Sequence, residues 1–212
     1  MTYPLKPHHE DNHDVAIDLM RKFSFAHFFS SLDDDHFVTR LPFVIDTDKN
    51  VLTRLRAHMN AKNPQANKID GAKVLVSFSG PDHYISPNWR AKSDRGATWD
   101  YSTVNVWGRC KIRKERSFFE TLINDLAVAN ESEVAHLVDK PQWSLENVTT
   151  DYVDRLFPAL ISFEVEVESV KSISKFHQDF PDEDALGVAE HLERIGSDTA
   201  TAVAQEIRNR RK

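Results

Sequence analysis

Hydrophobic residues in much of this chain recur at every second position, the spacing of strands with one buried face. Clusters of turn-forming residues separate these runs, such as the three aspartates at 33–35 and Asp-Thr-Asp-Lys-Asn at 46–50. Pro42 indicates an edge position or a bulge in the run that holds it. Consecutive strands joined by short turns predict an antiparallel, barrel-like sheet. The predicted strands span 23–32, 36–46, 51–59, 73–79, 101–112 and 160–176.

Helical spacing replaces this alternation mainly in the second half of the chain. Asn12 or Asp14 would cap the first helix, and Ser117 with Glu120 three residues later fits a capping box. Gly196 separates the last two helices. We therefore expect an α+β fold, in which one domain (1–212) forms a β-barrel and residues 181–212 form a helical C-terminal extension. The predicted helices span 14–23, 117–131, 149–157, 182–195 and 197–210.

Composition narrows the class of protein. A hydrophobic content of 40% and a charged content of 28% are typical of a folded, soluble chain of 212 residues. Cys110 has no other cysteine with which to form a disulfide, so we interpret it as a small core residue. The N-terminal residues lack the layout of an export signal, and no apolar run is long enough to span a membrane, so a cytoplasmic location is expected.

The net charge of −6 gives no general attraction for nucleic acid. A DNA contact would need a local basic patch, and the only dense candidate is Arg-Asn-Arg-Arg-Lys at 208–212. Basic residues at the end of a helix also interact favourably with its dipole, which is the simpler interpretation.

Known catalytic motifs are weak or missing. His9–His13 matches the zincin pattern His-Glu-x-x-His, but Pro4 and Pro7 lie just upstream and no third ligand is signalled nearby. We therefore expect no metal site. The chain contains neither a glycine-rich phosphate loop nor a Gly-x-Ser-x-Gly sequence, which removes the usual signatures of nucleotide hydrolysis and acyl transfer.

The segment Ala-His-Met-Asn-Ala-Lys-Asn-Pro-Gln at 57–65 is more specific. A strand is expected to end at His58 and Met59, with a helix or turn beginning near Ala61. Lys62 and the backbone N–H groups around Asn63 would then favour an anion such as a phosphate. The alternative is a plain strand-to-helix turn.

Residues 74–108 hold three of the four tryptophans. Gly80-Pro81 predicts a break in the strand, followed by a loop rich in aromatic side chains. Such rings either close the open end of a barrel or form a platform for a flat ligand, which Gly80 would let approach the backbone. The rings in this segment belong to His83, Tyr84, Trp89, Trp99 and Tyr101.

Three strings in this order and at this spacing resemble the PaiB-like family, the FMN-binding negative transcriptional regulators: HMNAKNPQ (58–65), VLVSFSGPDHYISPNW (74–89) and TWDYSTVNVWG (98–108). The segments VTRLPFVI (38–45) and KFHQDFPDEDALGVAEHLE (175–193) are also similar. The resemblance implies a split β-barrel of the flavin-reductase-like type. It also implies a homodimer that binds FMN in clefts where the two barrels meet.

The resemblance further implies a cofactor site built from several segments. Residues on the strand at 39–42 would face the flavin ring or ribityl chain, those at 58–63 would border the phosphate, and a Lys-x-x-Gln element would reach the same cleft. This chain departs from the family at Arg40 and Asn105, where the family has histidine, and at Ala66, where it has tryptophan. These departures bear on whether FMN is retained. The implied site residues are Thr39, Arg40, Leu41, Pro42, His58, Met59, Lys62, Asn63, Ser86, Trp89, Trp99, Tyr101, Lys175 and Gln178.

Two functions stay open at this point. The first is a homodimeric FMN-binding transcriptional regulator, although the sequence shows no helix-turn-helix signature, and the terminal helices are expected to pack on the barrel. The second is a flavin-dependent oxidoreductase acting on a small molecule or a nicotinamide cofactor. No acid–base pair stands out, so the sequence does not decide whether the protein catalyses turnover. His83 is either a proton donor or a hydrogen-bonded loop residue.

Overall fold

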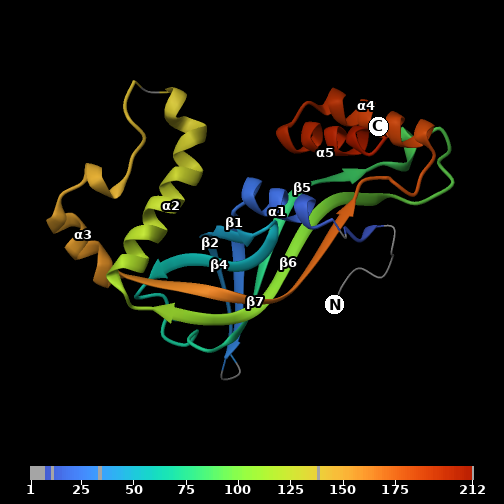
Figure 1. Cartoon of the computed structure of the whole chain (residues 1–212). Helices are drawn as coiled ribbons and strands as arrows, with labels where there is room; N and C mark the ends of the chain where they lie inside the picture. The colour runs from blue at the N-terminus through green and yellow to red at the C-terminus, as the bar shows by residue number, and fades with distance from the viewer. Residues whose placement is uncertain (1–7, 11, 33–34, 138, 212) are drawn as a thin grey trace. The chain divides into compact units, whose positions relative to one another are not determined.

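The computed structural model describes residues 8–10, 12–32, 35–137 and 139–211. Within them the chain forms an α+β fold of the split β-barrel type, whose antiparallel sheet does not close (Figure 1). The strand order is β2-β1-β5-β6-β7-β4-β3. The strands are β1 (Phe25–Leu32), β2 (Asp35–Pro42), β3 (Val44–Asp48), β4 (Val51–Asn60), β5 (Lys73–Ile85), β6 (Thr98–Arg113) and β7 (Leu160–Lys175). The α-helices are α1 (His13–Lys22), α2 (Arg116–Val134), α3 (Thr150–Leu156), α4 (Asp182–Ile195) and α5 (Asp198–Asn209).

The chain is organised as two compact units that share the long strands β5, β6 and β7. The first unit contains Met1–Leu19, Ser79–Val104 and Lys171–Lys212, and the second contains Met20–Phe78 and Asn105–Val170. None of the helices in the described part of the chain is long and apolar enough to span a bilayer.

Aromatic side chains form the centre of the second unit. Phe28, Phe43 and Phe163 are buried, and the centroids of the Phe28 and Phe163 rings lie 5.0 Å apart. Phe28 of β1 lies opposite Val76 of β5 in the register, and both side chains are buried on the same face of the sheet. As Pro42 predicted, β2 is an edge strand, and Pro42 is its last residue.

The opposite face of β4 and β7 carries a buried ionic network. Arg56 donates to Asp46 at 2.6 and 2.8 Å and to Asp125 of α2 at 2.7 Å. Glu164 of β7 accepts from Arg113 at 2.8 Å. Every residue from 162 to 165 is buried, so the alternation predicted for β7 does not leave a solvent-exposed face there.

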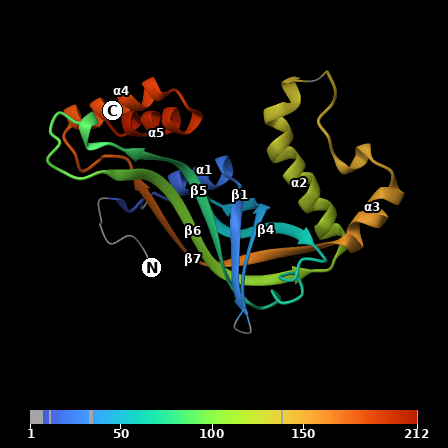
Figure 2. The same cartoon turned by 180° about the vertical axis from the view of Figure 1, so that it is seen from behind.

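Helices α4 and α5 pack against each other in the first unit, as Figures 1 and 2 both show. Their apolar faces meet Ile85 and Phe176 in one cluster, which confirms packing of these two helices within the fold. Gly196 ends α4 in the left-handed region at φ 69°, and Ser197 caps α5 by accepting from Ala200 N at 3.3 Å.

The prediction of one strand over 36–46 was wrong, because β2 ends at Pro42 and a separate strand, β3, begins at Val44. Two further local predictions were wrong. Gly80-Pro81 does not break β5, which continues to Ile85, and the neighbouring strand β6 begins at Thr98, so Trp99 lies on a strand rather than in a loop. The strand can continue because Gly80 has no side chain, and a Cβ there would lie 2.1 Å from the Ser102 hydroxyl. The second of these two concerns α2.

Ser117 does not cap α2. The helix begins at Arg116, and the Phe119 N–H already donates to Glu115 O at 3.2 Å, which places the cap position at Glu115. Glu120 does not complete a capping box, because its carboxylate pairs with Arg116 at 2.7 Å.

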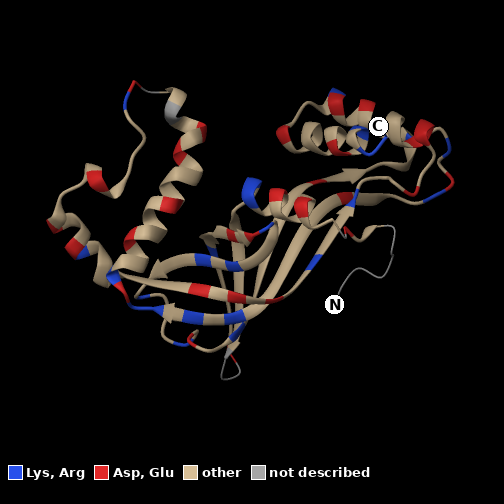
Figure 3. Ribbon diagram, viewed as in Figure 1, with Lys and Arg blue, Asp and Glu red and all other residues tan. Residues whose placement is uncertain are grey.

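The basic C-terminal segment is neutralised by acidic partners. Figure 3 shows acidic and basic positions along both α4 and α5. Each arginine between 208 and 211 has a carboxylate partner, and Lys212 lies outside the described residues. These ion pairs leave no concentrated positive patch at 208–211 for a nucleic acid. The pairs are Arg208–Glu193 at 2.7 Å, Arg210–Glu206 at 3.2 Å and Arg211–Asp182 at 2.7 Å.

Candidate functional site

The turn after β4 is fixed by a network of polar side chains. Thr39 of β2 donates to Gln65 Oε1 at 2.7 Å and accepts from Asn63 Nδ2 at 3.1 Å. Gln65 is fully buried and donates onward to Ser30 Oγ at 2.9 Å. The structure thus brings together two predicted site residues, Thr39 and Asn63. Gln65 and Ser30 were not among the predicted residues, although Gln65 stands within the quoted motif.

The backbone amides of this turn are already engaged. Lys62 N donates to Asn60 Oδ1 at 2.8 Å, Asn63 N donates to Asn60 O at 2.9 Å, and Gln65 N donates to Asn63 Oδ1 at 2.9 Å. Residues 61–68 form successive turns and no helix, so the helix N-terminus that could have bound an anion is absent. The expectation of free amides around Asn63 was therefore wrong, and any anion here would be held by side chains.

Lys62 is the side chain best placed for that role. It is exposed, and its ammonium group makes no hydrogen bond or ion pair with any described residue. Lys68, by contrast, pairs with Asp35 at 3.3 Å. An unpaired ammonium group beside an ordered polar turn is available to an anionic ligand.

His58 lies on β4, the strand that leads into this turn, four residues before Lys62. Its Nδ1 atom is buried and has no hydrogen-bond partner among the described residues. Burial lowers the pKa of the His58 imidazole below its ordinary value, so the ring is neutral at neutral pH. Buried polar atoms without a partner are rare and often mark a missing ligand or water molecule.

Neighbouring residues of the predicted site on β2 point to opposite faces of the sheet. Thr39 lies opposite the buried Phe28, whereas Arg40 lies opposite His27 on the other face. Arg40 donates to Phe25 O at 3.1 Å, and its guanidinium lies 4.5 Å from the centre of the Phe25 ring. It forms no ion pair in the described part of the chain.

Two other predicted residues of the second unit belong to the core. Leu41 of β2 and Met59 of β4 are buried. Pro42 is half-buried at the end of β2. Ala66, one of the three departures from the family pattern, is buried as well.

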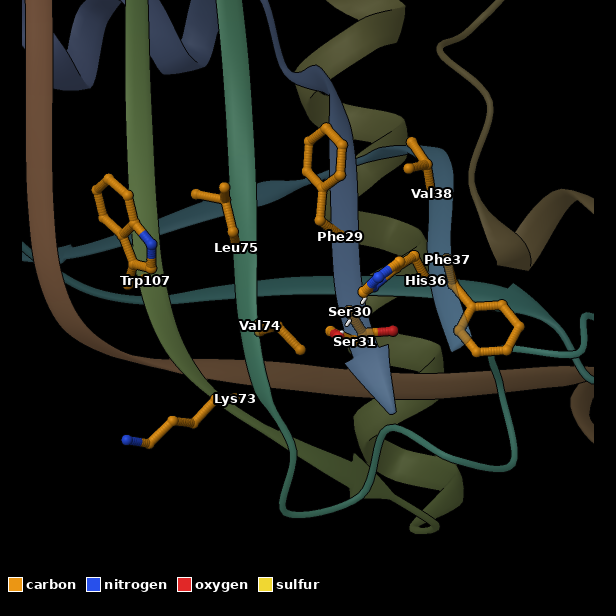
Figure 4. A pocket seen from close by; sticks show the side chains of 10 residues that line it. All are labelled: Phe29, Ser30, Ser31, His36, Phe37, Val38, Lys73, Val74, Leu75 and Trp107. Atoms are coloured by element: carbon orange, nitrogen blue, oxygen red, sulfur yellow. Dashed lines mark hydrogen bonds between the residues drawn. The ribbon is translucent and has the colours of Figure 1, made fainter. Parts of the chain in front are cut away.

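An apolar hollow of about 360 Å³ lies on the face that carries Arg40 (Figure 4). Adjacent strands supply its apolar side chains, because Phe29 of β1 lies opposite Val38 of β2 and Leu75 of β5. Val38, on the edge strand β2, is 56% exposed. At the end of the hollow, the Ser31 hydroxyl and His36 Nδ1 are 2.9 Å apart.

In the first unit, Trp99 and Tyr101 line a second hollow of about 290 Å³ between β5 and β6. Trp89, by contrast, packs against other side chains of the first unit. Its ring stacks on His191 of α4, with centroids 5.8 Å apart and planes inclined by 6°, and it packs on the α4–α5 cluster. His83 lies on β5, and its Nδ1 atom is 2.7 Å from Tyr84 O. The side chain is therefore hydrogen-bonded, as in the second of its two interpretations, but it lies on a strand and not in a loop.

The remaining predicted residues of the first unit hold the backbone in place. Lys175 donates to Trp99 O at 2.9 Å and to the Thr98 hydroxyl. Gln178 accepts from Phe176 N at 2.6 Å and donates to Ser174 O. Ser86 accepts from Asn88 N at 3.3 Å, at the start of the short helix η2 (Pro87–Trp89).

A buried charged cluster at the end of the β5–β6 hairpin escaped the sequence analysis. His177 Nδ1 lies 2.5 Å from Asp100 Oδ2, and Arg90 Nε donates to His177 Nε2 at 3.2 Å. Because an arginine can only donate, Nε2 is the acceptor and the imidazole proton lies on Nδ1, facing the carboxylate. With both ring nitrogens engaged, His177 joins the hairpin end to the segment before α4.

The zincin-like pattern is not presented on one helix. His9 forms a bridge with Ile173, whereas His13 is the first residue of α1, and residue 11 lies outside the described residues. The described residues contain no group of three or more side chains able to hold a metal ion. Cys110 is buried in β6, and burial raises the pKa of its thiol, in agreement with a core role.

Two proteins have sequences similar to this chain over most of its length. A Bacillus subtilis protein named protease synthase and sporulation protein PAI 2 is 23% identical over 159 residues, covering 74% of this chain and 73% of its own length. An uncharacterized Emericella nidulans protein, AN0679, is 25% identical over 205 residues, covering 81% of each chain.

Among solved structures, the flavocytochrome Anf3 from Azotobacter vinelandii superposes with a TM-score of 0.61 at 10% identity, covering 82% of this chain and 72% of that one. The conserved hypothetical protein Rv2991 from Mycobacterium tuberculosis superposes with a TM-score of 0.58 at 11% identity, covering 85% of this chain and 94% of that one. These likenesses show the fold. The family model described as "Putative FMN-binding domain" matches residues 2–169, and the chain therefore belongs to this PaiB-like family of flavin-binding split barrels.

Proposed function

We propose that this protein is a homodimeric FMN-binding member of the PaiB-like regulator family, and that Lys62 holds the FMN phosphate. The observation that carries the proposal is the unpaired, exposed ammonium group of Lys62 beside the Thr39–Asn63–Gln65 network. FMN carries a dianionic phosphate, which needs a cationic side chain once the backbone amides are engaged. The side chains present fit that requirement.

Other residues of the second unit fit the remainder of the cofactor. The buried Nδ1 of His58 has no partner in the described residues and is available to a polar ligand atom. Arg40 is exposed on its strand and supplies positive charge where the family has a histidine. When bound, FMN would supply electron or hydride transfer, while the protein would supply binding, orientation and charge.

The apolar hollow of the second unit supports the homodimer. Phe29, Leu75 and Trp107 form a half-buried apolar surface, which continues onto the exposed Val38 (Figure 4). Contiguous apolar surface of this kind is a feature of protein interfaces. A second copy of the chain is the partner that the family resemblance implies for such a surface.

A flavin-dependent oxidoreductase is the second candidate function. It is kept beside the regulator because the three C-terminal arginines that could have bound DNA are paired with carboxylates. Under the regulator hypothesis, an effect on transcription would then be exerted without a DNA contact from this segment.

The test of the FMN site compares FMN with riboflavin, which lacks the phosphate. Lys62 is exposed, so its attraction for a phosphate charge is close to the aqueous value of about 1 kcal/mol per unit charge at about 4 Å. Lys62→Ala should therefore weaken FMN by roughly five- to thirty-fold and leave riboflavin nearly unchanged. Lys114→Ala, at another exposed lysine of the same unit, is the matched control.

Flavin fluorescence quenching measures both affinities. Equal weakening of both ligands by Lys62→Ala would assign Lys62 another role, and failure of the wild type to quench FMN would remove the proposal. Sedimentation equilibrium tests the dimer, and Val38→Glu should shift the protein towards the monomer. FMN-dependent oxidation of NADH or NADPH supports the oxidoreductase, whereas sequence-specific, salt-sensitive DNA binding supports a direct regulator.

A further inference from the structure

We propose that the hollow between β5 and β6 in the first unit, here called the Trp99 pocket, binds a small organic cation such as a methylated ammonium group. Its volume of about 290 Å³ is near the lower end of small-molecule sites. The pocket is lined by Ser79, Gly80, Asp82, Trp99, Tyr101, Ser102 and Thr103.

The lining has one charge, and it is negative. Asp82 is the only ionisable acid or base among the lining residues apart from the Tyr101 phenol. Its carboxylate is exposed and makes no hydrogen bond or ion pair with the described residues. The other polar groups of the lining are neutral hydroxyls, so the pocket favours a cation and disfavours an anion.

The aromatic rings in the pocket favour a cation that also carries apolar groups. Trp99 is 54% exposed, which is costly for the largest aromatic side chain, and it meets Tyr84 edge-on with centroids 6.2 Å apart. Tyr101 adds a second ring to the wall. The faces of Trp and Tyr attract ammonium groups, and quaternary ammonium ligands are recognised by aromatic rings combined in this way.

The backbone around the pocket is held in place before a ligand arrives. Lys175 is not a lining residue, but it donates to Trp99 O at 2.9 Å and to the Thr98 hydroxyl, which fixes the start of β6. Gly80 lets the backbone pack closely on Ser102, because a Cβ at that position would lie 2.1 Å from Ser102 Oγ. A site that is held in shape in this way loses little entropy when it binds a ligand.

This inference does not rest on the proposed FMN site. The family resemblance assigns Trp99 and Tyr101 to the flavin, but Asp82 lines the same hollow, and its carboxylate, which has no partner among the described residues, disfavours a ligand bearing a phosphate. Cation binding is therefore measured without added flavin, and FMN binding is measured separately.

Isothermal titration calorimetry on the full-length protein tests the proposal with choline and its neutral analogue 3,3-dimethylbutan-1-ol. We expect saturable binding of choline and binding of the neutral analogue that is roughly ten-fold weaker or absent. Asp82→Asn and Trp99→Leu should each weaken choline by roughly ten-fold, because each removes one of the two attractions. Asp94→Asn and Trp143→Leu are the matched controls, since both positions are exposed and lie outside the pocket, and neither should change choline affinity.

Equal affinity for the two ligands would overturn the proposal, and so would an unchanged choline affinity in Asp82→Asn. No saturable heat with choline would also overturn it. If Trp99→Leu loses stability, Trp99→Phe takes its place in the test. This variant keeps a ring at the position and should retain most of the choline affinity. Choline binding without FMN binding would retain this inference and remove the proposed function. FMN binding without choline binding would retain the proposed function and remove this inference.

Discussion

Gly108 provides the sharpest test of how the strands pack. It lies on β6 in the second unit, where a Cβ would lie 2.2 Å from Glu166 O and 2.7 Å from Val165 Cγ1 of β7. Ordinary C···O contacts between strands are about 3.3–3.6 Å, so Gly108→Ala needs roughly 1 Å of extra separation. The obstructing atom is a backbone carbonyl oxygen, which cannot move aside by a rotation of its own.

Overpacking of this kind typically costs 1–3 kcal/mol, and an unyielding backbone contact belongs at the upper end, so we expect a loss of about 3 kcal/mol in the free energy of unfolding. For a chain of this size, about 1 kcal/mol corresponds to roughly 2–4 °C in the melting temperature. Gly108→Ala should therefore melt about 6–12 °C below the wild type in a thermal scan followed by circular dichroism.

Gly96→Ala is the matched control. A Cβ at Gly96 meets nothing within 4 Å, and the position carries no positive φ. Alanine should leave the stability unchanged or raise it slightly, since it restricts the unfolded chain. A Gly108→Ala protein that melts within about 2 °C of the Gly96→Ala protein would refute the close approach of β6 to β7.

Three further predictions concern buried groups. Arg56→Met should lower the free energy of unfolding by about 2–3 kcal/mol in urea titrations, because Asp46 keeps Arg54 at 2.6 Å but loses its buried partner. Burial lowers the pKa of His58 in the folded state, so below about pH 6.5 the unfolded chain takes up a proton that the folded chain does not, and stability falls. His58→Asn should reduce that acid-side loss, with His8 still contributing in the same direction, whereas an unchanged pH dependence would contradict it. Cys110 should react with a thiol reagent only after unfolding, because it is buried and its thiol pKa is raised; rapid native labelling would contradict this.

The family resemblance pointed to segments of the chain that the structure brings together in part. Thr39 and Asn63 meet in a direct hydrogen bond of 3.1 Å, and Thr39 also donates to the buried Gln65, which stands in a motif whose basic residue drew attention first. Trp89 has the same kind of ring as Trp99, yet it stacks on His191 of α4. Sequence shows which residues are aromatic or charged, but it does not show which of them have a partner.

Local sequence determined most of the elements, because alternation, helical spacing and turn residues act over a few positions. The ends of α4 and α5 follow from Gly196 and Ser197, and the edge position of β2 follows from Pro42. The continuation of β5 past Gly80 was decided by the tertiary structure, since the neighbouring Ser102 occupies the space of a side chain.

Only the tertiary structure decided which charged and polar groups are free to act. The Asp100–His177–Arg90 cluster joins His177 to Asp100, 77 positions away, and to Arg90, 87 positions away. No local pattern connects these residues. Lys62 is available because no carboxylate of the described chain reaches it, whereas the arginines at 208–211 are paired. Ion pairs depend on distances across the fold, which a local pattern does not encode, because electrostatic attraction falls with separation in space and not along the chain.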